Sequence, residues 1–207
     1  MRNRLIFSTS ILWLLATAIL LTIYLAWLLY PWEISHLQLA DQLPLAPGRI
    51  QHNFNILLDY LTNPFSQRLA MPDFPSSPAG LHHFAAVKGL FHLAQLVFVL
   101  TLPSLYFSYR EIIKKGFLPF YQRSILALMA LPFALALVGF FIGFNQFFTL
   151  FHQLLFVGDS TWLFDPARDP VILILPEEFF LHAFLLFFAL YQGLLALLYF
   201  KSRKKVS

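Results

Sequence analysis

Four segments of this chain are long and apolar enough to cross a lipid bilayer, which takes about 20 residues of α-helix. They cover approximately residues 5–30, 83–107, 125–148 and 179–200. With 59% of its residues hydrophobic and 12% charged, the chain has too little polar surface to enclose its apolar side chains in water. The sequence therefore predicts an all-α membrane protein with four transmembrane helices, which form a single integral membrane domain over residues 1–207.

The first segment needs a separate test, because Ala16-Thr17-Ala18 resembles a signal-peptide cleavage site. The apolar run continues beyond it through ILLTIYLAWLLY, which is longer than the core of a secretory signal. We therefore expect this segment to be a retained transmembrane helix.

Lysine and arginine residues are distributed unevenly around these segments. Ten of the fourteen precede the first segment, lie between the second and third, or follow the fourth. These ten are Arg2, Arg4, Arg110, Lys114, Lys115, Arg123, Lys201, Arg203, Lys204 and Lys205. Because positive residues stay on the cytoplasmic side, both termini are predicted to be cytoplasmic and loops 31–77 and 149–176 to face outward. This topology accounts for the net charge of +4, which gives no support for nucleic-acid binding.

The chain contains no cysteine. This excludes disulfides, a thiol nucleophile, iron–sulfur clusters and thiolate zinc sites. There is also no His-Glu-x-x-His motif, and the histidines do not have metal-ligand spacing. We therefore expect no metal and no cofactor.

The outward loop 31–77 contains the stretch NFNILLDYLTNPF, with apolar residues at Phe54, Leu57, Leu58 and Leu61. This is the spacing of one helix face, which predicts a short amphipathic helix at the membrane interface. The helix either covers one end of the bundle or serves as a lid over a substrate.

The second transmembrane helix has a clear start signal. Ser77 can cap it, and Pro78 stands at the first helical position. His82 and His83 then lie in its first two turns, near the outer membrane surface.

Lys88 follows deeper in the same helix and shares a face with His92 and Gln95. Lys88 could extend to the outer interface, as long basic side chains do near helix ends. Since a lysine in the outer half runs against the charge distribution, a buried functional role is the alternative.

The third helix is predicted to continue to Phe156, with a bend at Pro132 and His152 at its outward end. The fourth opens at Pro176, followed by Glu177 and Glu178, where acids favour a helix N-terminus.

Polar residues from several segments thus meet at the predicted outer surface. They are His82, His83, His152, Asp159, Trp162, Asp165, Arg168, Asp169 and Glu177. Each alone has a structural explanation: Trp162 as an interfacial aromatic, the aspartates as turn formers. Histidines from two different helices together with carboxylates are harder to explain in this way. Because imidazole titrates near neutral pH, the pattern indicates acid–base chemistry.

Two blocks of these residues resemble the bacterial lipoprotein intramolecular transacylase (Lit) family of small integral membrane proteins. One is His83-Phe-Ala-Ala-Val-Lys88; the other runs from Phe151-His152 through Trp162-Leu-Phe-Asp165-Pro166 and Asp169-Pro170 to Phe179-Phe180. Length and number of spans also match. An acid commonly stands two residues before the lysine in this family, whereas this chain has Ala86.

The resemblance implies an acyltransferase of the bacterial cell membrane whose partners are diacylglyceryl-modified lipoproteins among membrane phospholipids. The sn-2 acyl chain would move to the α-amine of the N-terminal cysteine and leave a lyso-form lipoprotein.

In this reading His83 takes the amine proton and His152 is its partner. The supporting residues would be Lys88 or Arg168 at the oxyanion, Asp165 orienting a histidine, and Trp162, Asp169 and Glu177. Which histidine plays which role stays open, as does the oligomeric state.

Two other classes of protein are compatible with the residues alone. One is a haem-binding four-helix bundle, with His92 and His182 as candidate ligands. The other is a non-enzymatic membrane chaperone or transporter accessory, in which the histidines are merely interfacial.

Overall fold

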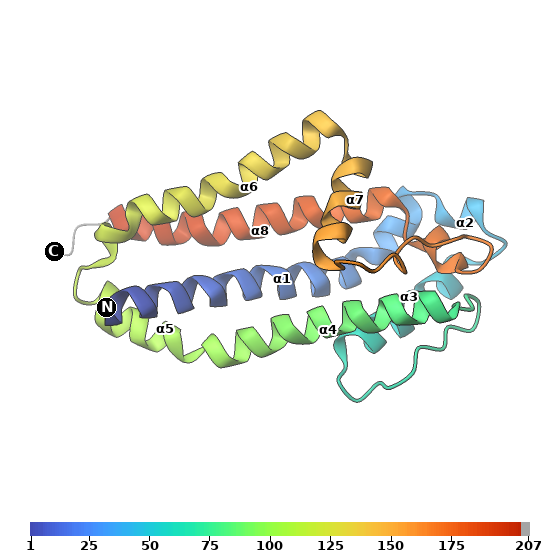
Figure 1. The fold of residues 1–207 in the computed structure, drawn as a ribbon, viewed down its shortest axis with the longest axis horizontal. Coiled ribbons are helices and arrows are strands. Elements are labelled where there is room, and N and C mark those ends of the chain that lie inside the picture. Colours follow the sequence, from blue (N-terminus) through green and yellow to red (C-terminus); the bar gives the residue numbers. More distant parts are fainter. Residues whose placement is uncertain (204–207) are drawn as a thin grey trace. The chain divides into compact units, whose positions relative to one another are not determined.

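The computed structural model describes residues 1–203 and is all-helical over that range, as the sequence predicts. Lys204 and Lys205, which were counted with the cytoplasmic charges, lie outside the described residues. Figure 1 shows the helices α1 Arg2–His36, α2 Leu39–Gln42, α3 Pro47–Thr62, α4 Pro78–Thr101, α5 Pro103–Ser108, α6 Gln122–Ile142, α7 Phe144–Leu155 and α8 Glu177–Arg203. Shorter helical turns cover Tyr109–Ile113, Leu118–Tyr121 and Pro170–Ile174.

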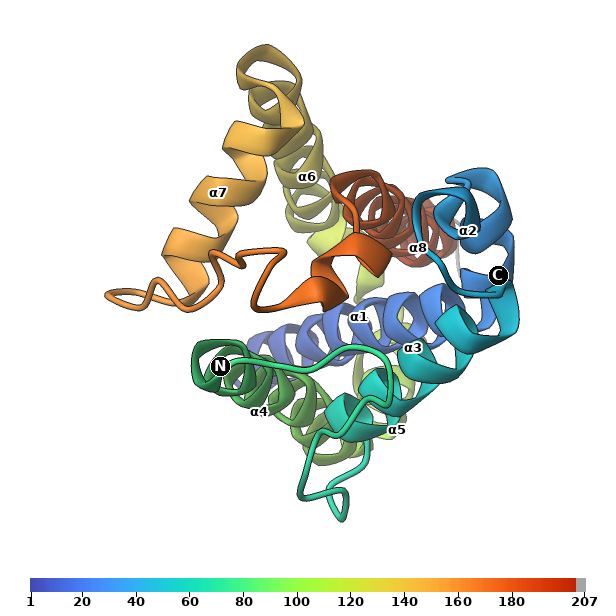
Figure 2. The same ribbon diagram turned by 90° about the vertical axis from the view of Figure 1, so that its right-hand side faces the viewer.

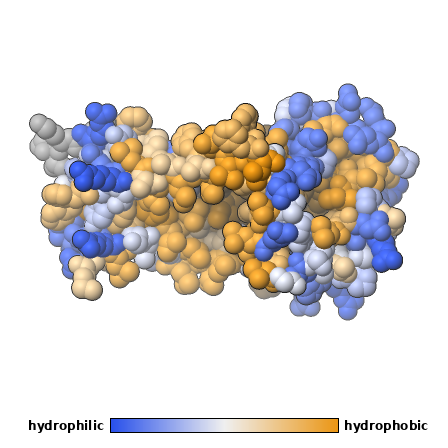
Figure 3. Space-filling view, turned by 45° about the horizontal axis from the view of Figure 1, so that its top comes forward, coloured by the Kyte–Doolittle hydropathy of each residue, from blue (hydrophilic) through white to orange (hydrophobic). Residues whose placement is uncertain are grey.

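Four helical stretches are long and apolar enough to span a membrane: Arg2–His36, Pro78–Ile113, Leu118–Ile142 and Glu177–Arg203. At most 11% of the residues in the apolar window of each are buried inside the protein. In Figure 3 the hydrophobic residues accordingly dominate the surface of the long helices. So many apolar side chains that are not covered by the protein itself must be surrounded by lipid. This confirms the prediction of four membrane spans.

The third span differs from its prediction at the outward end. The sequence predicted one helix to Phe156, but α6 ends at Ile142 and a separate helix, α7, begins at Phe144. Gly143 between them has a φ of +84°, a backbone conformation that side-chain-bearing residues rarely adopt. Pro132 lies inside α6, so the helix is interrupted at the glycine and not at the proline.

The described chain divides into two compact units. Unit 1 comprises residues 1–22, 94–142 and 185–203, and unit 2 comprises residues 23–93 and 143–184. The boundaries fall inside α1, α4 and α8, so each of these helices contributes to both units.

Unit 1 holds two small apolar clusters. One is centred on Phe7, Ile112 and Ile125, and the other on Ala18 and Leu195. At the N-terminus Arg2 and Lys115 both form ion pairs with Glu111, at 2.8 and 2.6 Å. The N-terminus and loop 114–117 are thereby held together, as a shared membrane side requires.

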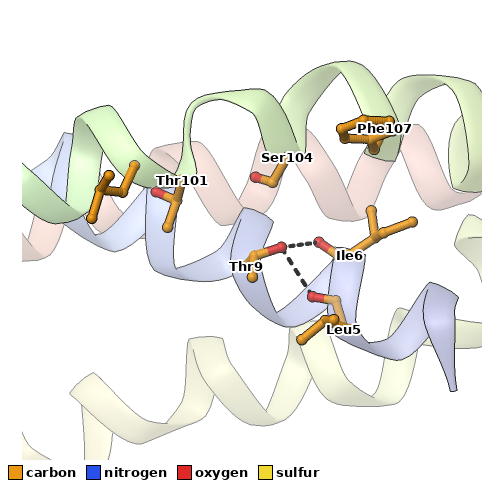
Figure 4. Close-up of a pocket in the computed structure, with 7 residues that line it drawn as sticks. Leu5, Ile6, Thr9, Thr101, Ser104 and Phe107 are labelled. Atoms are coloured by element: carbon orange, nitrogen blue, oxygen red, sulfur yellow. Dashed lines mark hydrogen bonds between the residues drawn. The ribbon is translucent and has the colours of Figure 1, made fainter.

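Unit 1 also contains an open cavity of about 220 Å³ (Figure 4). Its hydroxyl groups come from Thr9, Thr101 and Ser104, among apolar side chains such as Leu5 and Phe107. The Thr9 hydroxyl donates to backbone carbonyls of its own helix, so it already has hydrogen-bond partners within the protein. None of the predicted site residues lines this cavity.

Unit 2 holds the larger apolar core, and α3 provides much of it. Ile50, Phe54 and Leu57 are at most 1% exposed, and Phe54 stacks on Tyr30 with ring centroids 3.4 Å apart. Figure 2 shows α2 and α3 beside the end of α1. The helix predicted from NFNILLDYLTNPF is therefore present, and its apolar face packs inside the protein.

Candidate active site

His83 and His152 lie next to each other in unit 2. His83 is in the second turn of α4 and His152 in the last turn of α7, with ring centroids 5.9 Å apart. Phe156 and Phe164 pack on His83 at centroid distances of 4.9 and 5.4 Å. These rings leave His83 only 6% exposed. Two imidazoles from different helices thus share a largely apolar enclosure.

The hydrogen bonds of the two rings differ. The Nδ1 atom of His152 lies 2.9 Å from the carbonyl oxygen of Phe148, which can only accept, so Nδ1 carries the hydrogen. Its Nε2 is then the basic nitrogen when the ring is neutral. The Nδ1 atom of His83 is buried and has no hydrogen-bond partner among the described residues. Such an atom costs free energy unless a partner, such as a substrate, is supplied.

Burial lowers the pKa of His152 below its ordinary value of 6.5, partly offset by the hydrogen bond to Phe148. Desolvation disfavours the charged imidazolium, so His152 is neutral at neutral pH. A neutral imidazole is the form that can accept a proton.

Trp162 fixes the loop that follows α7 against the histidines. Its ring lies 4.9 Å from that of His152, and its indole N–H donates to the backbone carbonyl of Asp159 at 3.0 Å. The Asp159 carboxylate lies 3.2 Å from Nε2 of His82 and accepts the Thr161 N–H at 2.8 Å. The loop is thereby tied to both histidine-bearing helices. From the sequence we expected Asp165 to orient a histidine. In the structure the aspartate that contacts a histidine is Asp159, and the histidine is His82.

Asp169 secures the start of α4. It is 4% exposed and accepts hydrogen bonds from the backbone N–H and the hydroxyl of Ser77, both at 2.7 Å. The Ser77 hydroxyl in turn accepts the N–H of Gly80, which confirms Ser77 as the cap of this helix. A side chain at Gly80 would collide with the Asp169 carboxylate, so only glycine permits this approach.

The other predicted supporting residues contact other partners. Lys88 donates to the carbonyl of Ser66 and lies over the ring of Tyr60 at 4.4 Å, so it holds loop 63–77. Asp165 accepts the N–H of Ala167 and lies 3.9 Å from the exposed guanidinium of Arg168. Glu177 accepts from Asn145 at 3.0 Å, linking the starts of α8 and α7.

One buried polar pair was missed by the sequence reasoning. Glu33, in α1, is 6% exposed and lies 2.9 Å from Nδ1 of His182 in α8. The signal was available, since an acid at the end of an apolar helix is costly without a partner. His182 was considered only as a haem ligand. Within residues 1–203, no three His, Asp or Glu side chains are placed to hold a metal ion.

A model of the lipoprotein intramolecular transacylase Lit family matches residues 4–180, which is most of the chain. The chain belongs to the Lit family. The resemblance inferred from the two sequence blocks is thereby confirmed, as is the prediction of an acyltransferase that acts on lipoproteins.

Solved structures agree with the assignment to the Lit family. The membrane-integral Lit of Bacillus cereus is 32% identical, with a TM-score of 0.85 over 96% of this chain and 93% of that one. Two further structures of the Bacillus cereus protein carry a histidine replaced by arginine or by alanine, with TM-scores of 0.79 and 0.80. They are 33% and 32% identical, and each covers 98% of this chain and 91% or 92% of its own. No curated protein sequence matches this chain significantly.

Proposed function

We propose that His83 and His152 carry out the proton transfers of an acyl migration within a diacylglyceryl lipoprotein. The α-amine of the N-terminal cysteine attacks the carbonyl carbon of the sn-2 ester and forms a tetrahedral intermediate. The amine loses its proton to His83. The C–O bond to glycerol then breaks, and the departing oxygen takes a proton returned through His152. The products are an N-acylated cysteine and a glycerol with one free hydroxyl.

The proximity of the two imidazoles is the observation that carries this proposal. Their ring centroids are 5.9 Å apart, which supports the passage of one proton from the amine to the leaving oxygen by way of the two rings. The amine needs such a base, because its ordinary pKa of about 8 leaves it mostly protonated at neutral pH. The alkoxide leaving group is a strong base, so an acid must supply it with a proton as the C–O bond breaks.

The lowered pKa of His152 supports a cycle in which this ring starts neutral. The unpartnered Nδ1 of buried His83 supports a direct contact with substrate. Attack through a ring of roughly eight atoms is entropically poor in solution, so a site that holds both ends offers a large rate advantage. The rearrangement needs no nucleophile from the enzyme, which suits a chain without cysteine.

Asp159, Trp162 and Asp169 are proposed as positioning residues. Trp162 packs on His152, Asp159 ties the same loop to His82, and Asp169 secures the turn before His83. The contacts of Lys88 and Arg168 favour structural roles over the oxyanion role considered from the sequence. The remaining members of the predicted set, Asp165 and Glu177, likewise hold turns and helix starts.

The site is further proposed to face the outer side of the bacterial cell membrane, among phospholipids. The distribution of lysine and arginine supports this orientation, since ten of fourteen lie on the other side. Exported lipoproteins would meet the site there. The titratable groups around the histidine pair, chiefly Asp159 and His82, lie in or beside loop 149–176, which that orientation places outside.

The test is mass spectrometry of the N-terminal peptide of a lipoprotein. The host should make diacyl lipoproteins and lack any other N-acylating enzyme. With the wild-type gene we expect one acyl chain on the amine and one on glycerol, and with His83→Ala or His152→Ala we expect the diacylglyceryl form. An unaltered product in either variant, with the protein present at normal level in the membrane, would remove that histidine from the mechanism.

A further inference from the structure

A second feature of unit 2 is a hollow of about 280 Å³ beside the histidine pair. Its walls come from the end of α7 and from the loop after it, and include Gln153, Phe156, Asp159, Ser160, Trp162 and Leu163. Gln153 directly follows His152 in the chain. The acyl migration described above does not use this hollow.

Two walls of the hollow are also walls of the histidine pair. The ring of Phe156 lies 4.9 Å from that of His83, and the ring of Trp162 lies 4.9 Å from that of His152. A group seated in the hollow is therefore separated from the two imidazoles by a single layer of aromatic rings. Since the substrate is one continuous molecule, the part of it in the hollow must be close to the reacting amine.

The polar groups that line the hollow indicate which part of the substrate binds there. Gln153 and Ser160 are exposed to it with both donor and acceptor groups, and Asp159 adds a carboxylate. Hydrogen bonding from Thr161 and the neighbouring His82 lower the pKa of Asp159, so it is an acceptor at neutral pH. An acyl chain has no hydrogen-bonding group to offer them. A peptide offers one N–H and one C=O per residue.

The size of the hollow limits how much of the substrate it can hold. Pockets for small molecules typically enclose about 300–1,000 Å³, so this one accommodates only a short segment of a larger substrate. We infer that the hollow binds the backbone of the peptide segment that directly follows the acylated cysteine. This inference rests on the proposed function, because it assumes that the amine reacts beside His83 and His152.

The experiment compares three substrates with the purified full-length protein. The first is a diacylglyceryl-cysteine amide with no peptide. The second carries a four-residue glycine–serine extension, whose small side chains leave the backbone as the main contact. The third carries the same number of N-methylated residues, which have no backbone N–H. The variant is Gln153→Ala, and its control is Gln146→Ala, an exposed glutamine of α7 that does not line the hollow.

For the wild type we expect kcat/KM to be higher with the glycine–serine extension, by roughly two- to tenfold for one or two net hydrogen bonds. The N-methylated extension should lose this advantage. Gln153→Ala should lose it too and leave the reaction of the short substrate unchanged, while Gln146→Ala behaves as the wild type. Equal kcat/KM on all three substrates, or equal effects of the two glutamine variants, would overturn the inference.

Failure of the proposed function gives a different result. If His83→Ala converts the short substrate at the wild-type rate, the catalytic role of that histidine is wrong, yet the dependence on the extension is still measured. A wild-type protein that is folded and converts none of the substrates would overturn both.

Discussion

Helices α3 and α7 both lie outside the four membrane-spanning stretches, yet they are packed very differently. Half of the 16 residues of α3 are buried, and Phe54 and Leu57 are each 1% exposed. None of the 12 residues of α7 is buried, and Leu154 on it is 76% exposed. The helix that carries His152 is thus the less buried of the two.

The contacts of α7 explain how it stays folded with so little burial. Phe147, Phe148 and Phe151 pack edge-on or tilted against Phe180 and Phe184 of α8, at centroid distances of 5.0–5.5 Å. Ring contacts of this kind add about 0.5–1.5 kcal/mol each beyond area burial. The comparison indicates that α3 belongs to the core of unit 2, whereas α7 is held mainly by ring contacts with α8.

The largest expected effect is on the rate of acyl migration, which should depend on a histidine of α7 and not on a histidine of α3. His152→Ala should lower the rate of acyl migration by about 10²–10⁴-fold, the usual contribution of a general acid or base. His52→Ala, on the exposed side of α3, should leave the rate unchanged. Mass-spectrometric time courses on a diacylglyceryl lipopeptide give both rates. Similar losses in the two variants would show that α3 also takes part in the chemistry.

A phenylalanine removed from each helix separates their contributions to stability. Phe54→Ala should lower the free energy of unfolding by about 3–5 kcal/mol, because it leaves a cavity under Tyr30 and Phe179. Phe151→Ala, at a half-buried site, should cost clearly less. Thermal denaturation of the purified variants in one detergent measures the difference. If Phe151→Ala is the more destabilising, α7 is a core element and the comparison fails.

Glycines at the starts of the two helices provide a smaller contrast. Gly143→Ala forces a side chain into a positive φ of 84° before α7 and should cost about 1–3 kcal/mol. Gly48 is in the first turn of α3 with nothing within 4 Å of an added methyl group, so Gly48→Ala should be neutral or slightly stabilising. The same denaturation experiment compares them. Equal stability of the two alanine variants would argue that α6 and α7 join without strain.

The smallest expected effect concerns pH. Burial lowers the pKa of His152, so at a pH where an ordinary histidine is protonated this ring stays neutral and able to receive the proton that it returns to the leaving oxygen. Trp162→Ala exposes the ring and should raise this pKa back toward 6.5. The activity of the variant should therefore begin to fall at a higher pH than that of the wild type as the solution is acidified.

Profiles of kcat/KM against pH measure this shift, with Trp162→Phe as the control that keeps a ring in place. At alkaline pH His152 is neutral in both proteins, so each profile should be flat there, and the shift is read from profiles scaled to their own alkaline plateaus because the loss of Trp162 also lowers the absolute rate. Profiles that decline at the same pH in the alanine variant and the wild type would show that Trp162 does not shield His152.

Much of the fold follows from local features of the sequence. Runs of about 20 apolar residues determine four spans, because a bilayer offers no hydrogen bonds to an unpaired backbone. Ser77 and Pro78 determine where α4 begins, and the spacing of Phe54, Leu57 and Leu61 determines α3. Motif order in residues 151–180 was enough to indicate the family. In each case the decisive interaction is with a near neighbour in the chain or with the solvent.

Pairings between distant residues were decided only by the tertiary structure. The sequence could not show that Asp159, and not Asp165, lies on a histidine, or that Asp169 meets Ser77 from 92 residues away. It also did not show Glu33 opposite His182, or Lys88 directed to Ser66. A carboxylate beside a turn looks the same in the sequence whatever it contacts. Its partner depends on how segments far apart in the chain pack together, which is a property of the fold and not of the local sequence.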